Sequence, residues 1–587
     1  MDAPNRNTLW ARALVEELAR GGVSAVCVSP GSRSTPLTMA VTEHEEIRVF
    51  SHLDERSAAY FALGRARRTG EVTPLVCTSG TAAANYHPAV LEADQSRVPL
   101  LALTADRPPE LRESGANQTA DQEKLYGDAV RWYKDLSEPE AEARKLRSLR
   151  STVARALAEA EGTNPGPVHL NVPFRKPLEP VGVPGDVPDD LDSLAAEGRI
   201  GDGPEPAAFV ERRSGAGELD DAQLRALANE LSVERGLIVV GPADPTEIDP
   251  ESVVALSHAT GFPIIADPLS GLRFGGHTRV APVVGGYDGY LDETVTGDWP
   301  EPEAVLRIGA SPTSKPLRTY LARTGAHQIV VDPAGGWREA EFTAAELVVA
   351  DPSRLAGALA RVVSGPGSAE WRQLWEDAEA THWEAVDDEE GLFEGGIVAD
   401  TADLAPEPST LFVSNSMPVR DLDRFARPSP DALTALGNRG VSGIDGITST
   451  ALGAGSATTD HLTLLIGDLA YYHDMNGLLA VARCEVDATI VLLNNDGGGI
   501  FHMLPIESFD PPFTSQFKTP HGLDFEPSAE LYDLDYEAVD GREGFRDAYA
   551  AAVSSDGTAV IEVSTDAVDS HATRDGLREQ VLETVRN

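Results

Sequence analysis

The chain has 587 residues, of which 41% are hydrophobic, and this is enough to build several domains with buried cores. It carries 94 acidic and 48 basic residues, a formal net charge of −46, which argues against nucleic acid or an anionic membrane surface as a partner. No apolar run reaches the length of a membrane-spanning helix.

Lysine is nearly absent from this acidic chain. Only six of the 48 basic residues are lysines, and the acidic residues are scattered, as in Asp189–Asp192 and Asp387–Glu390. Such a composition resembles that of proteins from salt-accumulating microbes, in which molar salt shortens the Debye length to about 3 Å and screens self-repulsion. The alternative is an acidic protein from an ordinary mesophile.

The cysteines and the N-terminus indicate the compartment. Cys27, Cys77 and Cys484 are far apart and lack metal-ligand spacing, so we expect reduced core residues in a cytoplasmic protein. The polar segment Met1–Arg6 lacks the pattern of a signal peptide, which agrees with a cytoplasmic location.

Residues 1–182 alternate helical and strand patterns and predict a first α/β unit. A helical stripe is formed by Trp10, Ala13, Leu14 and Leu18. Strands are expected at Val23–Val28, Ile47–Phe50, Pro99–Thr104 and Pro167–Val172.

A stretch rich in proline, glycine and aspartate, at about 178–205, predicts a linker. Residues 206–365 predict a central α/β unit, with strands at Gly236–Val240, Pro263–Ile265, Ala304–Ile308 and His327–Val331. A second linker begins at Ser364–Ser368, and residues 369–587 form the last unit. The fold expected is α/β, with three consecutive doubly wound parallel-sheet domains at 1–182, 206–365 and 369–587.

The last unit contains the most informative spacing of the chain. The apolar run His461–Ile466 predicts a buried strand with Asp468 at its carboxyl end. A helix is expected over Asn476–Cys484, and a second buried strand, Ala488–Leu493, ends at Asn494-Asn495. In a βαβ unit both strand ends reach the same edge of the sheet, so Asp468 and Asn495 should lie close together.

This edge predicts a metal and phosphate site. A carboxylate and an amide oxygen, with a backbone carbonyl such as that of Gly497, suit a hard Mg²⁺ that keeps phosphate oxygens as ligands. The run Gly497–Gly499 lets the backbone approach a diphosphate closely. The alternative is an α/β protein with no ligand here, and Leu469 stands where the usual pattern has glycine.

Further blocks carry a family resemblance, and they are Ser29–Pro36, His52–Arg56, Thr78–Thr81, Ala105–Pro108, Asn117-Gln118, Asn415–Arg420 and Asn438–Gly446. With Gly467-Asp468 and Asn494–Phe501 they closely resemble the menaquinone-pathway synthases that make 2-succinyl-5-enolpyruvyl-6-hydroxy-3-cyclohexene-1-carboxylate, in the thiamine-diphosphate decarboxylase-like superfamily. The resemblance spans nearly the whole chain and is weakest in the central unit, where it depends mainly on Ser314-Lys315.

The resemblance implies how thiamine diphosphate would be bound. Glu55 would hydrogen-bond the aminopyrimidine ring and support proton removal through the cofactor, as a general acid–base group. Asp468, Asn495 and the Gly497 carbonyl would hold Mg²⁺, for which Mn²⁺ could substitute, and Ile444 would prop the bent cofactor. Further cofactor contacts are expected from Thr81, Asn117, Ser416 and Ile500. Taken singly, Glu55 could be a solvated loop carboxylate and Ile444 simple core.

The resemblance also implies the substrates, 2-oxoglutarate and isochorismate, which are both dicarboxylates. A chain at −46 repels both at long range, so the site needs local positive charge, and arginine binds carboxylates with a bidentate fork. The succinyl carboxylate would be held by Ser416, Arg420 and Arg439. Isochorismate would face Ser32, Arg33, Arg107, Gln118 and Lys315. Each arginine could alone be an ordinary ion-pair residue, and Pro316 stands where some family members have a second basic residue.

The implied activity is decarboxylation of 2-oxoglutarate and 1,4-addition of the succinyl carbanion equivalent to isochorismate, with release of CO₂, in menaquinone biosynthesis. The first rival is another enzyme of the superfamily, such as an acetolactate synthase or a 2-oxoacid decarboxylase, and the second is a degenerate, non-catalytic binding fold. Glu55 and Asp468 must touch opposite ends of one cofactor, so we expect a homodimer or homotetramer with active sites between subunits.

Overall fold

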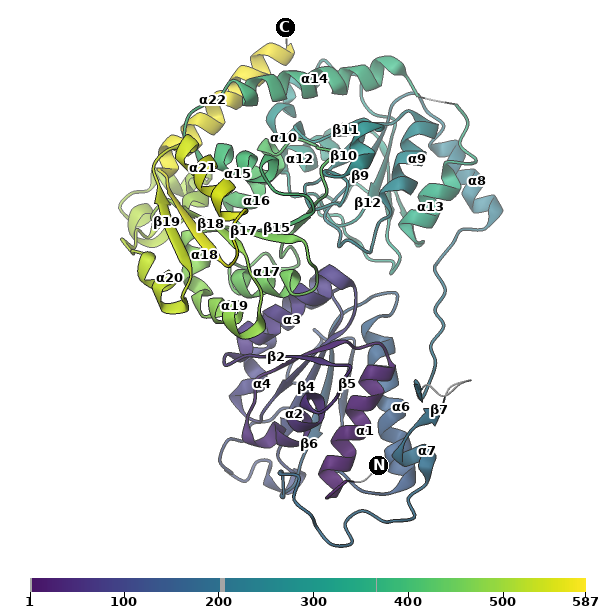
Figure 1. Ribbon diagram of the computed structural model, residues 1–587. Coiled ribbons are helices and arrows are strands. Elements are labelled where there is room, and N and C mark those ends of the chain that lie inside the picture. Colours follow the sequence, from purple (N-terminus) through teal and green to yellow (C-terminus); the bar gives the residue numbers. More distant parts are fainter. Residues whose placement is uncertain (1–2, 201–205, 366, 587) are drawn as a thin grey trace.

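Three six-stranded sheets follow one another along the chain (Figure 1). The structure is a computed structural model and describes residues 3–200, 206–365 and 367–586. Within the described residues every strand pair in these sheets is parallel, and a separate two-stranded antiparallel sheet is formed by β7 (Arg199–Ile200) and β8 (Pro206–Ala207). The expected α/β architecture with three parallel sheets is confirmed.

The first and third sheets have the same topology. The first sheet runs in the order β2 (Arg48–Ser51), β1 (Ala25–Val28), β3 (Thr73–Cys77), β4 (Leu100–Asp106), β6 (Val168–Pro173) and β5 (Trp132–Asp135). The third runs in the order β16 (Leu433–Leu436), β15 (Ser409–Val413), β17 (His461–Gly467), β18 (Thr489–Asn494), β20 (Ala559–Ser564) and β19 (Asp535–Val539). If the strands of each sheet are numbered from its first, both orders are 2-1-3-4-6-5.

The central sheet has the doubly wound order 3-2-1-4-5-6 of dinucleotide-binding folds. Its strands are β11 (Val283–Val284), β10 (Ile264–Ala266), β9 (Gly236–Val240), β12 (Ala304–Ile308), β13 (His327–Val331) and β14 (Glu346–Val348). The strands predicted at Gly236–Val240, Ala304–Ile308 and His327–Val331 are confirmed with the same bounds.

Helices cover both faces of each sheet. Those associated with the first sheet are α1 (Arg6–Arg20), α2 (Thr35–Thr42), α3 (Glu55–Thr69), α4 (Thr81–Asn85), α5 (His87–Ser96), α6 (Ala143–Ala160) and α7 (Ser193–Ala196). Those of the central region are α8 (Asp221–Glu230), α9 (Pro250–Thr260), α10 (Tyr287–Tyr290), α11 (Glu293–Thr296), α12 (Lys315–Arg323) and α13 (Pro352–Leu359). The remaining helices are α14 (Ala369–Asp387), α15 (Glu394–Asp403), α16 (Met417–Phe425), α17 (Ile447–Gly455), α18 (Asp468–His473), α19 (Leu479–Cys484), α20 (Glu526–Tyr532), α21 (Arg542–Ala552) and α22 (Ala567–Arg586).

The inner strands, such as β3 and β4, are buried on both faces, which explains their apolar sequences, whereas the edge strands β2, β5 and β19 are partly exposed. In β1, Ala25 and Cys27 pack in a core shared with α3, whereas Val26 and Val28 pack with α1, α2 and α6 on the opposite face. All three cysteines are buried and free, as expected. Among the described residues, no helix is both long and apolar enough to cross a membrane.

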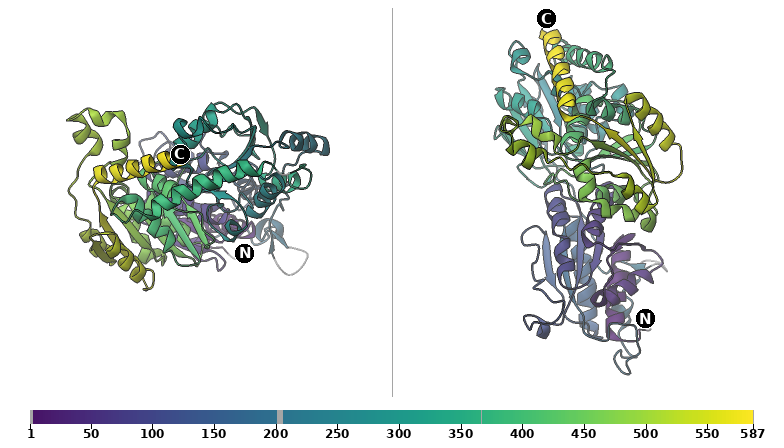
Figure 2. Two further views of the ribbon diagram at one scale, coloured as in Figure 1. Left: turned by 90° about the horizontal axis from the view of Figure 1, so that it is seen from above. Right: turned by 90° about the vertical axis from the view of Figure 1, so that its left-hand side faces the viewer.

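Helices α3 and α17 join the first and third units. One continuous apolar core runs from the first sheet through these helices to the third sheet. The helices cross at glycines: a Cβ on Gly64 would lie 1.8 Å from the Thr450 carbonyl oxygen, and one on Gly453 would lie 1.9 Å from the Phe61 carbonyl oxygen. Ser57 and Ser449 add a hydroxyl–hydroxyl hydrogen bond of 2.8 Å. The first unit therefore stands at one end of the molecule, with the central and third units beside each other at the opposite end (Figures 1 and 2).

The C-terminal helix returns to the central unit. Trp371 and Trp375 of α14 and Val581 of α22 share a buried cluster with residues of the central sheet and its helices. Helix α14 lies inside the range predicted for the last domain, yet it packs on the central sheet, and the domain boundaries stay a prediction.

Candidate active site

The predicted βαβ unit of the third sheet is present. Strands β17 and β18 are parallel neighbours, with Gly467 opposite Leu493 at their carboxyl ends. Asp468 begins α18 directly after β17, and Asn495 follows the last residue of β18. The intervening helix differs from expectation, because Met475–Leu478 form a 3₁₀ turn and only Leu479–Cys484 are α-helical. A Cβ on Gly477 would lie 2.5 Å from Ser449 Oγ, so this turn packs closely against α17.

Asp468 is a buried carboxylate held by three donors. Its side chain accepts hydrogen bonds from Leu469 N (2.6 Å), Gly497 N (2.9 Å) and His521 Nε2 (3.1 Å). Burial raises the pKa of Asp468, and the hydrogen bonds oppose that rise. A cation next to the carboxylate would favour its charged form further.

Asn495 presents a free oxygen beside Asp468. Its Nδ2 donates to Glu394 Oε1 at 2.7 Å, whereas its Oδ1 is buried and has no hydrogen-bond partner among the described residues. Buried polar atoms without partners are rare and costly, so this oxygen is suited to a ligand. Gly497 has φ 138°, and a Cβ there would lie 2.0 Å from the Lys518 carbonyl oxygen, so only glycine fits.

These groups line a cavity of about 170 Å³. The predicted residues around it are Ser416, Ile444, Asp468, Asn495, Gly497 and Ile500, and Glu394 and Asn415 complete its polar wall. Gly467 also lines the cavity. A Cβ there would meet no atom within 4 Å, so a larger side chain would occupy cavity space without a clash at its Cβ. A carboxylate, an unpaired amide oxygen and glycine backbone fit a divalent cation with a diphosphate.

A second cavity of about 640 Å³ adjoins the first, because Ile500 lines both. Its basic side chains are Lys315, Arg318, Arg420, Arg424, Arg574 and Arg578. Three of them are neutralised locally: Arg424 pairs with Asp288, Arg574 with Asp421, and Arg578 with Asp292. Lys315, Arg318 and Arg420 supply cationic groups for an anionic ligand, in a wall that also contains the carboxylates of Asp423, Glu507 and Asp575.

Arg420 lines the second cavity, and Arg439 contacts a residue in the wall of the first. Arg420 Nη1 donates to the Ser416 carbonyl oxygen at 2.5 Å, and Arg439 Nη1 donates to Asn415 Oδ1 at 2.7 Å. Burial lowers the pKa of both arginines, and for Arg420 the nearby charge of Arg439 lowers it further. Ser416 has φ 74°, an uncommon backbone conformation for a residue other than glycine, and it begins the turn into α16.

The predicted residues of the first unit form a separate cluster. Arg33 is 5% exposed, Arg107 Nη2 donates to the Asn117 carbonyl oxygen at 2.7 Å, and Gln118 Nε2 donates to the Ser79 carbonyl oxygen at 3.2 Å. Burial lowers the pKa of Arg33, and the Arg107 charge contributes. Ser32 is exposed, Thr81 begins α4, and Glu55 begins α3 after the Asp54 cap.

Within the described residues, none of these first-unit side chains lines either cavity of the third unit. The chain therefore brings together Ser416, Arg420, Ile444, Asp468, Asn495, Gly497, Ile500 and Lys315 in two joined cavities, with Arg439 bonded to Asn415 in the wall of the first, and it holds Ser32, Arg33, Glu55, Thr81, Arg107, Asn117 and Gln118 elsewhere.

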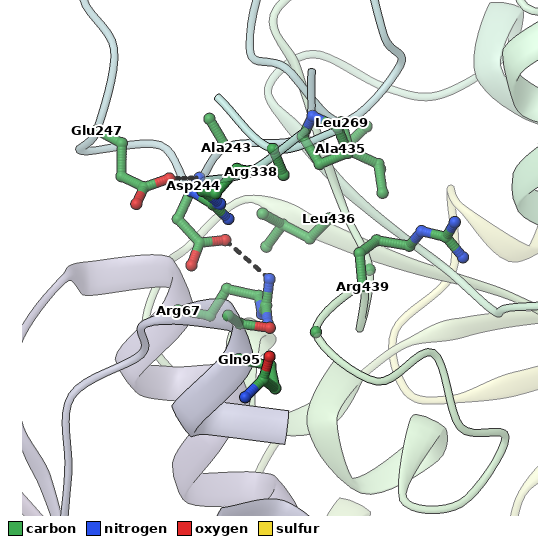
Figure 3. Close-up of a pocket in the computed structure, with 15 residues that line it drawn as sticks. Arg67, Gln95, Ala243, Asp244, Glu247, Leu269, Arg338, Ala435, Leu436 and Arg439 are labelled. Carbon is green, nitrogen blue, oxygen red and sulfur yellow. Dashed lines mark hydrogen bonds and ion pairs between the residues drawn. The ribbon is translucent and has the colours of Figure 1, made fainter. Parts of the chain in front are cut away.

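A third, smaller pocket of about 40 Å³ lies where the three units meet (Figure 3). An ion pair crosses it, with Arg67 Nη1 of α3 at 3.0 Å from Asp244 Oδ1 of the central unit. Burial raises the pKa of Asp244 to about 7 despite the charge of Arg67. The Arg439 side chain points away from this ion pair (Figure 3). The pocket is too small to hold a cofactor, and it lies at the junction between the three units.

Sequence reasoning missed Glu394, His521 and Arg318. Glu394 is 5% exposed and positions Asn495, but it lies 101 residues before it in the chain. His521 contacts Asp468 from 53 residues further on. Neither stands in a motif block, so only the tertiary structure identifies them. Arg318 lies one helical turn after Lys315, and that spacing is the one signal the sequence offered.

Comparisons with known proteins agree with this geometry. The thiamine pyrophosphate enzyme N-terminal TPP binding domain matches residues 10–125, and the corresponding C-terminal TPP binding domain matches residues 425–563. A 2-succinyl-5-enolpyruvyl-6-hydroxy-3-cyclohexene-1-carboxylate synthase of Halorubrum lacusprofundi is 64% identical, over 99% of this chain and 98% of that protein. The synthase of the same name from Haloarcula marismortui is 63% identical over the full length of both.

More distant proteins share the arrangement. The Roseiflexus castenholzii synthase of the same name is 49% identical, over 96% of this chain and 97% of that protein. A solved thiamine diphosphate-dependent 4-hydroxybenzoylformate decarboxylase from Rhodococcus jostii superposes with a TM-score of 0.70, over 95% of this chain and 99% of that one. At 20% identity, this last likeness shows the fold alone.

Proposed function

The chain belongs to the family of 2-succinyl-5-enolpyruvyl-6-hydroxy-3-cyclohexene-1-carboxylate synthases, and from this premise we propose how its residues perform that reaction. It is a thiamine-diphosphate-dependent enzyme of menaquinone biosynthesis that joins the succinyl unit of 2-oxoglutarate to isochorismate with loss of CO₂. The residue assignment depends on one observation. Ile500 lines both the cavity around Asn495 and the second cavity, which we call the cation-lined cavity after its lysine and arginine side chains.

Asp468, Asn495 Oδ1 and the Gly497 carbonyl would hold Mg²⁺ and, through it, the diphosphate. The unpaired Asn495 Oδ1 supports this assignment, and the Gly497 carbonyl, which accepts from Gly499 N at 3.1 Å, keeps a second lone pair. Mn²⁺ accepts the same oxygen ligands and could replace Mg²⁺. The bound thiamine ring supplies the electron sink for decarboxylation. Ile444 and Ile500, which line the cavity, would position that ring together with Ser416.

Arg420 and Arg439 would bind the distal carboxylate of 2-oxoglutarate, with Ser416 at the same turn. Burial disfavours the charged form of both arginines in the free protein, the charge of Arg439 disfavours that of Arg420 further, and a bound carboxylate would stabilise both charges. The charge pairing also explains why a dicarboxylate donor would be preferred to pyruvate, which lacks the distal group.

Isochorismate would be bound by residues from two places, namely Ser32, Arg33, Arg107 and Gln118 of the first unit and Lys315 of the central unit. Lys315 lines the cation-lined cavity, whereas the first-unit residues lie elsewhere in the same chain. Glu55, Thr81 and Asn117 are separated from the diphosphate site in the same way. We therefore propose that a second copy of the chain supplies these residues, in a homodimer or a homotetramer of the cytoplasm.

The test is product analysis by mass spectrometry. The purified protein with thiamine diphosphate and Mg²⁺ should convert 2-oxoglutarate and isochorismate to the named product, and pyruvate should be a much poorer donor. Equal use of pyruvate would favour an acetolactate synthase or a 2-oxoacid decarboxylase. Cofactor titration with and without Mg²⁺ distinguishes the enzyme from a non-catalytic binding fold, because such a fold need not bind cofactor in a metal-dependent manner.

A further inference from the structure

The cation-lined cavity contains an arginine, Arg318, to which the proposed function assigns no role. Arg318 lines it together with Lys315 and Arg420. The nearest carboxylate among the described residues is Glu341, with 3.6 Å between Arg318 Nη1 and Glu341 Oε1. This distance exceeds that of a hydrogen bond, so the guanidinium keeps free N–H donors.

The backbone fixes Arg318 at this wall. Ser314 caps α12, its Oγ accepting from Leu317 N at 3.2 Å and donating to Asp288 Oδ1 at 2.7 Å. Arg318 N continues the helix by donating to the Ser314 carbonyl oxygen at 3.2 Å. Lys315 and Arg318 are three residues apart and therefore lie on one face of the helix. The Arg318 side chain is 29% exposed, and its Nε is buried without a partner among the described residues.

Arg318 also acts on the two arginines assigned to the donor. Its positive charge helps to lower the pKa of Arg420 and of Arg439, although burial is the larger cause for both. Three guanidinium groups thus share one field, and nearby carboxylates, among them Asp423, offset part of their repulsion. An arrangement of this kind is stabilised when an anion binds among the charges.

We propose that Arg318 is a second anchor for the distal carboxylate of the dicarboxylate donor, acting beside Arg420. The proposal rests on the proposed function, because it takes the cation-lined cavity as the place where that carboxylate binds. The guanidinium group of Arg318 can make two parallel hydrogen bonds to a carboxylate, which the ammonium group of Lys315 cannot do. Pro316 and Leu317 carry no charge, so Arg318 is the next cation after Lys315 along the helix.

The test measures binding separately from turnover. Glutarate, a dicarboxylate without the reactive keto group, and butyrate, its monocarboxylate counterpart, are titrated calorimetrically into the holoenzyme in molar KCl. Arg318→Gln should weaken glutarate binding about 10-fold or more, as expected for a lost charge-assisted hydrogen bond, with little change for butyrate. Arg318→Lys should recover part of the loss. In steady state, Arg318→Gln should raise the KM for 2-oxoglutarate much more than the KM for isochorismate.

The matched control is Arg323→Gln, on the same helix. Arg323 pairs with Glu293 at 3.3 Å and does not line the cavity. The Arg323→Gln enzyme should therefore bind glutarate with an affinity within about 2-fold of wild type, because it loses only an exposed ion pair. A complementary variant, Glu341→Gln, removes the carboxylate that lies 3.6 Å from Arg318 and should tighten glutarate binding.

Unchanged glutarate affinity in Arg318→Gln, or a loss confined to isochorismate, would overturn the proposal. If Arg318→Gln does not fold, Arg318→Lys and Glu341→Gln still decide, because unchanged glutarate affinity in both also overturns it. Failure of the proposed function has a different signature, namely a wild-type holoenzyme that makes no product from 2-oxoglutarate and isochorismate.

Discussion

Glu394 accepts a hydrogen bond from Asn495 Nδ2 at 2.7 Å and so turns Asn495 Oδ1 away from itself, where it has no partner among the described residues. Thr565 Oγ1 donates to the same Glu394 oxygen at 3.1 Å and fixes the carboxylate. A buried carboxylate in the wall of the cavity therefore determines which atom of the amide can act as a metal ligand.

The first prediction follows from this pair. Glu394→Ala should raise the Mg²⁺ concentration needed for half-maximal thiamine diphosphate binding about 10- to 100-fold, because Asn495 loses the contact that orients its amide. Fluorescence titration of the cofactor at a series of Mg²⁺ concentrations measures the shift. Wild-type Mg²⁺ dependence in a folded variant would contradict the positioning role.

Glu55→Gln should bind cofactor but lose turnover by about 10²- to 10⁴-fold, because an amide cannot support the proton relay. The metal ligands are untouched by this change. Exchange of the thiamine C2 proton, followed by NMR in the holoenzyme, should slow in parallel. Near-normal exchange would refute the assignment of Glu55.

Two inactive chains should complement each other. Asp468→Ala lacks the metal carboxylate and Glu55→Gln lacks the general acid–base group, yet a hybrid dimer would contain one intact site if each site uses two chains. Mixing the variants under conditions of subunit exchange should restore part of the activity. No recovery, with exchange demonstrated by mass spectrometry, would mean that each chain builds its own site.

Salt should strengthen the assembly. A dimer brings together two chains that each carry a net charge of −46, and screening shortens the Debye length from about 10 Å at 0.1 M to about 3 Å at 1 M salt. Sedimentation should show more dimer, and assays more activity, as KCl rises from dilute buffer to molar concentration. A protein that is fully dimeric and most active at low salt would contradict this.

Gly64→Ala should destabilise the protein strongly. Its Cβ would lie 1.8 Å from the Thr450 carbonyl oxygen, which is main chain and cannot rotate away, so overpacking should cost about 1–3 kcal/mol or more. The control is Gly576→Ala in α22, where a Cβ meets no atom within 4 Å and where alanine should be neutral or stabilising. Thermal unfolding in matched KCl compares the two, and equal Tm values would refute the packing argument.

The sequence predicted the βαβ unit around Asp468 because the apolar runs of β17 and β18 are buried strands, whose pattern depends on local composition. It also placed several strands of the central sheet correctly. The partner of Asn495 could not be predicted, since Glu394 lies far away in the chain and stands in no motif. The separation of Glu55 from Asp468 within one chain is equally invisible to local patterns, because it depends on how whole units pack.

The crossing of α3 and α17 has a consequence for how this protein can change over evolutionary time. Because Gly64 and Gly453 bring main chain against main chain, the spacing between the first and third units is set by atoms common to every residue. Acidic side chains can then accumulate on the surface, or be lost from it, without moving the first unit relative to the third unit of the same chain. The residues that adapt the protein to its medium and those that keep the spacing of its units therefore lie in different parts of the polypeptide.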